Sequence, residues 1–305
     1  MRYVVTGAAG FVGSHLAEAL VADGHDVVGV DCFTDYYDPA EKEANAAGLD
    51  VRRLDLAEDA LDLDGVDGVF HLAAQAGVRS FGDVFPLYLR RNVLATQRVL
   101  EAAAAARTRV VIASSSSVYG EAEAYPTPEE AEPRPISPYG ITKLACEHLA
   151  RAYAAGFGAD AVVLRYFTVY GPRQRPDMFF RRVCDALLDG TTFEIYGSGE
   201  QSRSFTYVGD AVAATIAAME RAPAGAVYNV GGGDEASMLE AIALLEELSG
   251  RTLGVRHLDR AKGDVARTKA DVSRIGDALG WRPETPLRDG LSAMWSWASG
   301  RVAAA

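Results

Sequence analysis

Tyr139 and Lys143 stand four residues apart in the stretch Tyr139-Gly140-Ile141-Thr142-Lys143. On a helix, this spacing places the phenol and the ammonium group on one face. A cation near the phenol favours its ionised form, so Tyr139 could take a proton from a substrate hydroxyl near neutral pH. The same spacing also arises by chance on surface helices, so it indicates catalysis only together with its surroundings.

A run of four serines, Ser114 to Ser117, follows an apolar stretch of strand length at 110–113. In doubly wound sheets, ligands bind beyond the carboxyl ends of the strands. One of these hydroxyls could therefore orient the reacting oxygen of a substrate. A polar surface loop would give the same run, so the serines also need support from their neighbours.

Gly7, Gly10 and Gly13 follow the first apolar stretch, at 3–6, and precede a helix that we expect to begin near Phe11. Glycines permit a tight turn and a close backbone approach. The amino end of the helix can then face a pyrophosphate, as in dinucleotide-binding proteins.

Asp31 directly follows the second apolar stretch, at 26–30, and lies eighteen residues after Gly13. A carboxylate there can accept hydrogen bonds from the hydroxyls of an adenosine ribose. A solvated strand end would also explain Asp31 by itself, but the glycine loop and Asp31 together indicate a bound dinucleotide. A 2'-phosphate would face like charge at this position, so the sequence predicts NAD rather than NADP.

These groups need a sheet that brings the ends of several strands together. Apolar stretches of strand length alternate with helical patterns, at 3–6, 26–30, 69–72, 110–113 and 161–165. The alternation predicts an α/β fold with a doubly wound, parallel Rossmann sheet. The expected helices include 86–106 and 138–155, the second with Ser137 as N-cap and Pro138 at its first position.

The pattern becomes less regular after Arg165. From Thr168 to Thr206 we expect irregular segments rich in Gly, Pro and Arg. A helix at 208–221 and a strand at 227–230 should follow, and this return segment should rejoin the large sheet.

Ser237 and Glu240 form the pattern of a capping box, at the start of a helix that we expect to end near Gly250. The C-terminal part is therefore predicted to be a smaller substrate-binding lobe, interleaved with the Rossmann domain. The expected division is 1–167 with a return segment at about 206–230 for the NAD-binding domain, and 168–205 with 231–305 for the lobe.

Composition excludes several classes of protein. The 305-residue chain is 49% apolar, which is ample for a buried core. Cys32, Cys146 and Cys184 are odd in number and far apart, so we expect neither disulfides nor a metal site. Without a signal-peptide pattern or a long apolar span, we expect a cytoplasmic protein with no membrane contact. The net charge of -12 argues against nucleic acid as a partner.

The glycine loop, the strand, the serines and the Tyr139 helix follow one another as in the short-chain dehydrogenase/reductase superfamily, which the chain resembles over most of its length. This resemblance implies that Tyr139 and Lys143 act in catalysis. Alignment on Tyr119-Gly120 makes Ser115 their hydroxyl partner.

Further stretches similar to that superfamily are Asp55-Leu56, Leu72-Ala73-Ala74 and Asn92-Val93. The resemblance implies that these stretches line NAD. The residues expected to bind NAD are Gly7, Gly10, Phe11, Val12, Gly13, Asp31, Asp55, Leu56, Leu72, Ala73, Ala74, Asn92, Tyr139, Lys143 and Tyr166.

The segment at 165–172, RYFTVYGP, is similar to the extended branch of the superfamily, whose members use sugar nucleotides. Three more segments, at 31–39, 71–79 and 171–178, resemble UDP-glucuronate 4-epimerases. The resemblance therefore implies a UDP-sugar as substrate, with UDP-glucuronic acid as the first candidate.

Such a substrate carries a diphosphate and a carboxylate, which need cationic and hydroxyl donors. Arg175 could meet either group, and Arg203 matches the diphosphate-binding arginine of the family. Asp264 occupies a family position near the uridine ribose, in a region that departs from the usual pattern. Three other arginines are expected to be solvated charges beside a helix: Arg173, Arg181 and Arg182.

The implied reaction begins when Tyr139 removes the proton of the 4-hydroxyl while a hydride leaves carbon 4 for NAD. The 4-keto sugar then turns over in the pocket, and the hydride returns to its opposite face. This keto sugar is a β-keto acid that can lose carbon dioxide, so an epimerase must hold its carboxylate. The candidates for that task are Ser116, Ser117, Thr168 and Arg175.

Related activities remain open. UDP-glucose/UDP-galactose 4-epimerases typically carry Asn where Thr168 stands, and UDP-glucuronate decarboxylases usually carry Glu where Ser117 stands. The 4,6-dehydratases resemble S-T-D-E-V-Y-G at 114–120, so their acid and base are missing here. A protein that only senses the dinucleotide is disfavoured by the joint presence of serine, tyrosine and lysine. Family members commonly pair through the two helices that end near Ala106 and Ala155, so we expect a homodimer.

Overall fold

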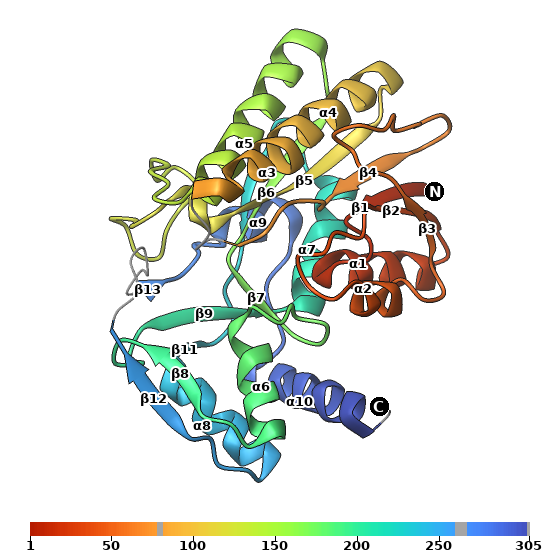
Figure 1. Cartoon of the computed structure of the whole chain (residues 1–305). Coiled ribbons are helices and arrows are strands. Elements are labelled where there is room, and N and C mark those ends of the chain that lie inside the picture. Colours follow the sequence, from red (N-terminus) through yellow and green to blue (C-terminus); the bar gives the residue numbers. More distant parts are fainter. Residues whose placement is uncertain (78–81, 260–266, 304–305) are drawn as a thin grey trace.

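A parallel sheet of seven strands forms the centre of the computed structural model, which describes residues 1–77, 82–259 and 267–303 (Figure 1). The strands lie in the order β3-β2-β1-β4-β5-β6-β10, and each neighbouring pair is parallel. Their bounds are β1 Arg2–Thr6, β2 Asp26–Asp31, β3 Asp50–Arg53, β4 Gly68–His71, β5 Arg109–Ser115, β6 Ala161–Tyr166 and β10 Val227–Val230. This is the predicted doubly wound sheet, and its strand order reverses direction between β1 and β4.

Helices cover both faces of this sheet, with α1 and α7 in one apolar layer and α4 and α5 in the other. Their bounds are α1 Phe11–Ala22, α4 Ala95–Ala106, α5 Pro138–Phe157 and α7 Val208–Arg221. Side chains alternate along a strand, so Val5 of β1 packs in the first layer and Val4 in the second. Burial on both faces explains why the central strands are runs of apolar residues rather than alternating ones.

Two features of this part of the chain differ from the sequence-based expectation. The helix expected at 86–106 consists of α3 (Phe85–Tyr88), a π-helical turn η2 (Leu89–Leu94) and α4. Strand β3, which follows α2 (Pro39–Asn45), was not predicted because three of its four residues are charged. It is an edge strand, where charged side chains reach solvent.

The segment between β6 and α7 forms regular elements, so the expectation of irregular chain from Thr168 to Thr206 is wrong. These elements are β7 Thr168–Tyr170, α6 Phe179–Asp189, β8 Phe193–Tyr196 and β9 Ser202–Tyr207. Helix α6 buries Phe180, Cys184 and Leu187 on one side, at the spacing of a helix face. The strands before and after α6 are short. The glycines and arginines around them therefore obscure their apolar pattern.

These elements form the small lobe together with later parts of the chain, below the large sheet in Figure 1. The later parts are β11 Glu235–Ser237, α8 Met238–Ser249, β12 Val255–Leu258, β13 Arg267–Thr268 and α10 Leu287–Ala303. Strand β9 pairs with β7, β11 and β13, and β8 pairs with β12. The predicted capping box is present, because the Ser237 and Glu240 side chains each accept a hydrogen bond from the other's N–H, at 3.1 and 2.7 Å.

The two lobes are interleaved, as predicted. Helix α7 and strand β10 return to the large sheet, and α9 (Ser273–Leu279) also packs there through Ile275 and Leu279. The C-terminal segment is therefore not confined to the small lobe. The division into an NAD-binding domain and a substrate-binding lobe stays a prediction about function. Among the described residues, no helix is long and apolar enough to cross a membrane.

Candidate active site

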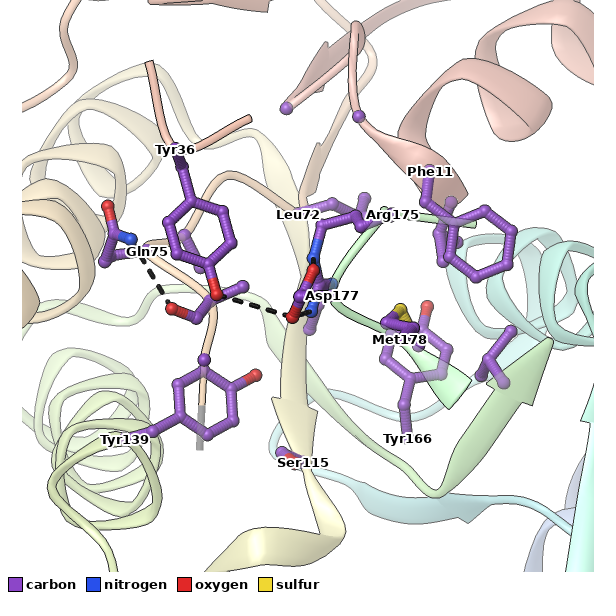
Figure 2. A pocket seen from close by; sticks show the side chains of 18 of the residues that line it. Phe11, Tyr36, Leu72, Gln75, Ser115, Tyr139, Tyr166, Arg175, Asp177 and Met178 are labelled. Atoms are coloured by element: carbon purple, nitrogen blue, oxygen red, sulfur yellow. Dashed lines mark hydrogen bonds and ion pairs between the residues drawn. The ribbon is translucent and has the colours of Figure 1, made fainter. Parts of the chain in front are cut away.

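A cavity of about 720 Å³ lies along the carboxyl edge of the large sheet and reaches into the small lobe (Figure 2). It brings together the predicted catalytic residues Ser115, Tyr139 and Lys143. The predicted substrate residues that line it are Ser116, Ser117, Thr168, Arg175 and Arg203. The predicted cofactor residues that line it are Gly7, Gly10, Phe11, Val12, Gly13, Asp31, Asp55, Leu56, Leu72, Ala73, Ala74, Tyr139, Lys143 and Tyr166. Asp264 lies outside the described residues.

The loop between β1 and α1 turns tightly because its glycines have no side chains. Gly7 has a φ of 71°, and its N–H donates to the Val30 carbonyl at 2.7 Å. A Cβ on Gly13 would lie 2.1 Å from the Gly7 carbonyl oxygen, so α1 approaches the loop only with glycine there. Gly10 is the N-cap of α1 and offers no side chain to the first N–H groups. These groups and the helix dipole are therefore open to an anion such as a pyrophosphate.

Asp31 lies at the end of β2, on the cavity wall. Its carboxylate accepts hydrogen bonds from the N–H groups of Ala9 and Phe33, at 3.2 and 2.8 Å, which fix its orientation. Lys42 of α2 also lines the cavity and donates to the Thr34 carbonyl at 2.6 Å. Burial lowers the pKa of Lys42, and the neighbouring Asp31 carboxylate partly offsets that effect. A carboxylate and an ammonium group thus stand together where a ribose is expected.

The π-helical turn η2 contacts two residues that line the cavity, Asp55 and Gln75. Its Arg90 donates to the Asp55 carboxylate at 2.7 Å. Its Asn92 is buried, accepts the Gln75 N–H at 2.7 Å and donates to the Thr142 hydroxyl at 3.0 Å. Asn92 is not among the residues that line the cavity, in contrast to the expectation from the resemblance. Its bonds hold Gln75, which does line the cavity, against α5.

Helix α5 places Tyr139 and Lys143 one turn apart on the face that lines the cavity, as predicted. The helix begins sharply because the Ser137 hydroxyl accepts the Gly140 N–H at 3.1 Å. The Lys143 Nζ atom lies 5.9 Å from the centroid of the Tyr139 ring and donates to the Ala113 carbonyl at 2.8 Å. The carbonyl of β5 therefore fixes the ammonium group beside the phenol.

Ser115 ends β5 and caps the short turn η3 (Ser116–Val118). Its Oγ accepts the Ser117 N–H at 3.2 Å and lies 3.2 Å from the Ser117 Oγ. A Cβ on Gly140 would lie only 2.4 Å from the Ser117 carbonyl oxygen. The glycine that follows Tyr139 therefore lets α5 pack directly against the serine turn, and the phenol and the hydroxyls share one cavity.

A buried ion pair holds the same face of α5 against the sheet. Glu147, one turn after Lys143, pairs with Arg165 of β6 at 2.7 Å, and their side chains are 4% and 5% exposed. The Ser114 hydroxyl donates to Glu147 at 2.5 Å. Burial alone would lower the pKa of Arg165, but Glu147 more than offsets this, and the net pKa is raised. The pair ties α5 to β5 and β6.

Arg175 enters the cavity from the segment that leads into α6, and it is paired within the protein. Its Nε and Nη2 atoms donate to the two oxygens of Asp177, at 2.9 and 3.0 Å. The Tyr36 hydroxyl donates to the same carboxylate at 3.4 Å, from the loop after β2 (Figure 2). Burial, followed by the Asp177 charge, raises the pKa of Tyr36 to about 12. This chain of contacts links the loop after β2 to the segment before α6.

The three arginines expected to be solvated are not, so that expectation is wrong. Arg181 of α6 is buried and donates to Glu41 of α2 at 2.9 Å, which joins the small lobe to the large one. Arg182 lines the cavity. Arg173 is half-buried and pairs with Glu18 of α1 at 2.7 Å.

Arg203 and Thr168 complete the polar wall beside the small lobe. Arg203 lies on β9, lines the cavity and donates to the Ser202 carbonyl at 2.8 Å. Thr168 begins β7, two residues after the end of β6, and lines the cavity between the two lobes. The cavity therefore offers donors from both lobes to an anionic ligand.

Comparison with known proteins places the chain in a family. The model of the NAD dependent epimerase/dehydratase family matches residues 3–231, which is more than half of the sequence. The chain belongs to this epimerase/dehydratase family. Membership confirms the predicted resemblance and the predicted dependence on NAD.

Relatives within the family cover nearly the whole chain. The uncharacterized UDP-glucose epimerase YtcB of Bacillus subtilis (strain 168) is 42% identical over 304 residues, 96% of each protein. The crystal structure of UDP-glucuronic acid 4-epimerase from Bacillus cereus, in complex with UDP-glucuronic acid and NAD, has a TM-score of 0.95 and 39% identity, and the match covers 99% of this chain and 100% of that one. MoeE5 was solved with NAD and either UDP-glucuronic acid or UDP-glucose, and it has a TM-score of 0.89 and 44% identity over 99% of this chain and 100% of its own.

Several residues of the cavity were not assigned a role from sequence, and they include Tyr36, Lys42 and Asp177. Two of these three stand inside the segments that carry the resemblance, at 31–39 and 171–178. A signal was present for Asp177, because an acid two residues after Arg175 can fold back onto it. Lys42 gave none, because lysines are common on exposed helices.

Proposed function

We propose that this protein is a UDP-sugar 4-epimerase that converts UDP-glucuronic acid into UDP-galacturonic acid. The observation that carries the proposal is that one cavity holds the Tyr139 and Lys143 pair, the serine turn, Arg175 and the dinucleotide loop. A sugar in this cavity could present its 4-hydroxyl to the phenol and its carboxylate to the guanidinium. Two structural neighbours that were solved with UDP-glucuronic acid and NAD support the choice of substrate.

The residues around the glycine loop fit NAD. The amino end of α1 has no side-chain cap and can receive the pyrophosphate, and a Cβ on Gly13 would destroy this cradle. Asp31, held by two backbone N–H groups, can accept the ribose hydroxyls. When bound, NAD accepts a hydride from carbon 4 of the sugar and returns it to the opposite face.

Tyr139 is the proposed acid and base. The Lys143 ammonium stabilises the phenolate, so Tyr139 can take the proton of the 4-hydroxyl and give it back after the keto sugar has turned over. Ser115 is held by the Ser117 N–H and can orient the reacting oxygen. Positioned proton transfer of this kind contributes about 100- to 10,000-fold to a rate.

Ser116, Ser117, Thr168 and Arg175 are proposed to hold the sugar carboxylate. The 4-keto sugar is a β-keto acid, which loses carbon dioxide most easily when the breaking bond is aligned with the carbonyl π system. Hydroxyl and guanidinium donors stabilise the charge on the carboxylate and restrain its rotation. They therefore favour epimerisation over decarboxylation.

Epimerisation of UDP-glucose is the second candidate. Arg175 is already paired with Asp177, so a neutral sugar would not leave its guanidinium without a counter-ion. MoeE5, which was solved with UDP-glucose as well as UDP-glucuronic acid, supports this alternative.

Product analysis by NMR tests the proposal, with purified protein, NAD and each UDP-sugar in a separate reaction. We expect UDP-galacturonic acid to form with a higher kcat/KM than UDP-galactose. A higher kcat/KM for UDP-glucose would move the assignment to the neutral sugar. A UDP-pentose as the main product would indicate a decarboxylase, and NAD binding without turnover of any UDP-sugar would indicate a sensor.

We also propose that the protein is a homodimer that pairs through α4 and α5, which lie side by side. Exposed apolar side chains of α5 and of the turn before α4 include Leu94 of η2 and Ile141 and Phe157 of α5. Burial of these side chains in a partner would remove apolar surface from water. The cytoplasmic location and the contact between Asp264 and uridine stay predictions from sequence.

A further inference from the structure

Arg175 has its own counter-ion in the cavity. Its Nε and Nη2 atoms bond both oxygens of Asp177, and the two side chains are 23% and 40% exposed. The Tyr36 hydroxyl, from the loop after β2, donates to the same carboxylate at 3.4 Å (Figure 2). Within the part of the chain that the structure describes, Nη1 of Arg175 makes no hydrogen bond, so this donor is available to a ligand.

The pair changes the electrostatics of sugar binding. A neutral sugar meets an arginine whose charge is already balanced, so binding leaves no partly buried cation unpaired. An acidic sugar brings a second carboxylate to the same guanidinium, and the two carboxylates repel each other. Both effects reduce the difference in affinity between acidic and neutral sugars.

We propose that Asp177 determines sugar specificity as the resident counter-ion of Arg175, so that the cavity accepts both UDP-glucuronic acid and UDP-glucose. The inference rests on the proposed function and deepens it, because it names two substrates of one site. Arg175 supplies the attraction for the acid, and Asp177 limits that attraction. Tyr36 keeps Asp177 in the position where it does so.

The test is the ratio of kcat/KM for UDP-glucuronic acid to kcat/KM for UDP-glucose. Asp177→Asn removes the charge but keeps the shape, and we expect the ratio to rise about 10-fold. The effect should be moderate because Asp177 is partly exposed and water screens its charge. Most of the change should lie in KM, since binding is altered rather than proton transfer.

Two variants separate charge from structure. Asp177→Glu keeps the negative charge, and its ratio should stay closer to that of the wild type than to that of Asp177→Asn. Glu18→Gln is the matched control. Glu18 lies on α1 and pairs with Arg173, which belongs to the same segment as Arg175. Glu18 does not line the cavity. The substitution should leave the ratio unchanged. If Asp177→Asn does not fold, Asp177→Ser removes the same charge with a smaller side chain.

The outcomes distinguish this inference from the proposed function. Epimerisation of both sugars with a ratio that Asp177→Asn does not raise would overturn the role of Asp177 and leave the epimerase intact. If neither sugar is epimerised, the proposed function fails, and the ratio of dissociation constants, measured by calorimetry on NAD-loaded protein, decides the role of Asp177. Binding of neither sugar would overturn both.

Discussion

A Cβ atom on Gly13 would lie 2.1 Å from the carbonyl oxygen of Gly7. The first turn of α1 therefore packs against the loop at a distance that only glycine permits. Gly13→Ala must push the helix away from the loop, at a cost of about 1–3 kcal/mol in the free energy of unfolding. Because the same turn should receive the pyrophosphate, we also expect NAD affinity to fall by about 10-fold or more. Chemical denaturation and calorimetric titration measure the two effects.

Gly156 provides the control for that substitution. It lies in the last turn of α5, and a Cβ there would meet no atom within 4 Å. Gly156→Ala should therefore leave NAD binding unchanged and keep or slightly raise stability, since alanine favours helices by up to about 1 kcal/mol. Equal losses of NAD affinity in the two variants would contradict the role of the Gly13 contact.

Asp31→Ala tests cofactor choice. In the wild type, the oriented carboxylate should accept the ribose hydroxyls of NAD and repel the 2'-phosphate of NADP. Removal of the carboxylate should lower the affinity for NAD and raise the affinity for NADP relative to that for NAD. Lys42, which remains nearby, should help to attract the 2'-phosphate. The measurement is the dissociation constant for each cofactor, before and after the substitution. Equal affinity for both cofactors in the wild type would remove this role from Asp31.

Tyr139→Phe tests the proposed acid and base. The variant should fold and bind NAD nearly as the wild type does, while turnover falls by about 100-fold or more. Lys143→Ala should also lose most of its activity, because the cation beside the phenol is gone. Steady-state kinetics, with NAD titration as the check on folding, gives both results.

Tyr153→Phe is the matched control on the same helix. The Tyr153 hydroxyl accepts a hydrogen bond from Gln97 at 2.6 Å, and the residue does not line the cavity. Its loss should leave turnover close to that of the wild type. Near-normal turnover in Tyr139→Phe would show that another group moves the proton.

The sequence predicted the large sheet well because two local signals agreed there. Central strands buried on both faces need apolar runs, and the glycine loop and the Ser137 cap mark where helices begin. The edge strand β3 had neither signal, since its charged side chains face solvent. Prediction from sequence therefore failed at this exposed edge strand, where burial does not require apolar residues.

The prediction of the small lobe from sequence failed for another reason. Helix α6 does carry an apolar face, including Phe180, Val183 and Leu187, but neighbouring arginines and glycines suggested irregular chain. Arg181 is buried between Asp185, one turn along α6, and Glu41, which is distant in sequence. The Arg175–Asp177 pair likewise depends on how the segment before α6 folds, because the fold brings the two side chains together. Motifs predicted which residues line the cavity, but charge pairing within it required the tertiary structure.

Thr168→Ala and Ser117→Ala test how the cavity protects the keto sugar. Each substitution removes one proposed hydroxyl donor to the carboxylate, so the intermediate should more often reach the geometry that loses carbon dioxide. We expect a decarboxylated UDP-pentose beside UDP-galacturonic acid, detected by mass spectrometry. An unchanged product mixture in both variants would assign the protection to Arg175 and Ser116.

In the proposed reaction, hydride leaves carbon 4 of the sugar and returns to the opposite face of the same carbon. UDP-glucuronic acid with deuterium at carbon 4 tests this most directly, in ordinary water with NAD-loaded wild-type protein and NMR analysis of the product. We expect UDP-galacturonic acid that keeps its deuterium at carbon 4, because the label stays with the bound cofactor between the two transfers. Product that has exchanged this deuterium for solvent hydrogen would contradict it.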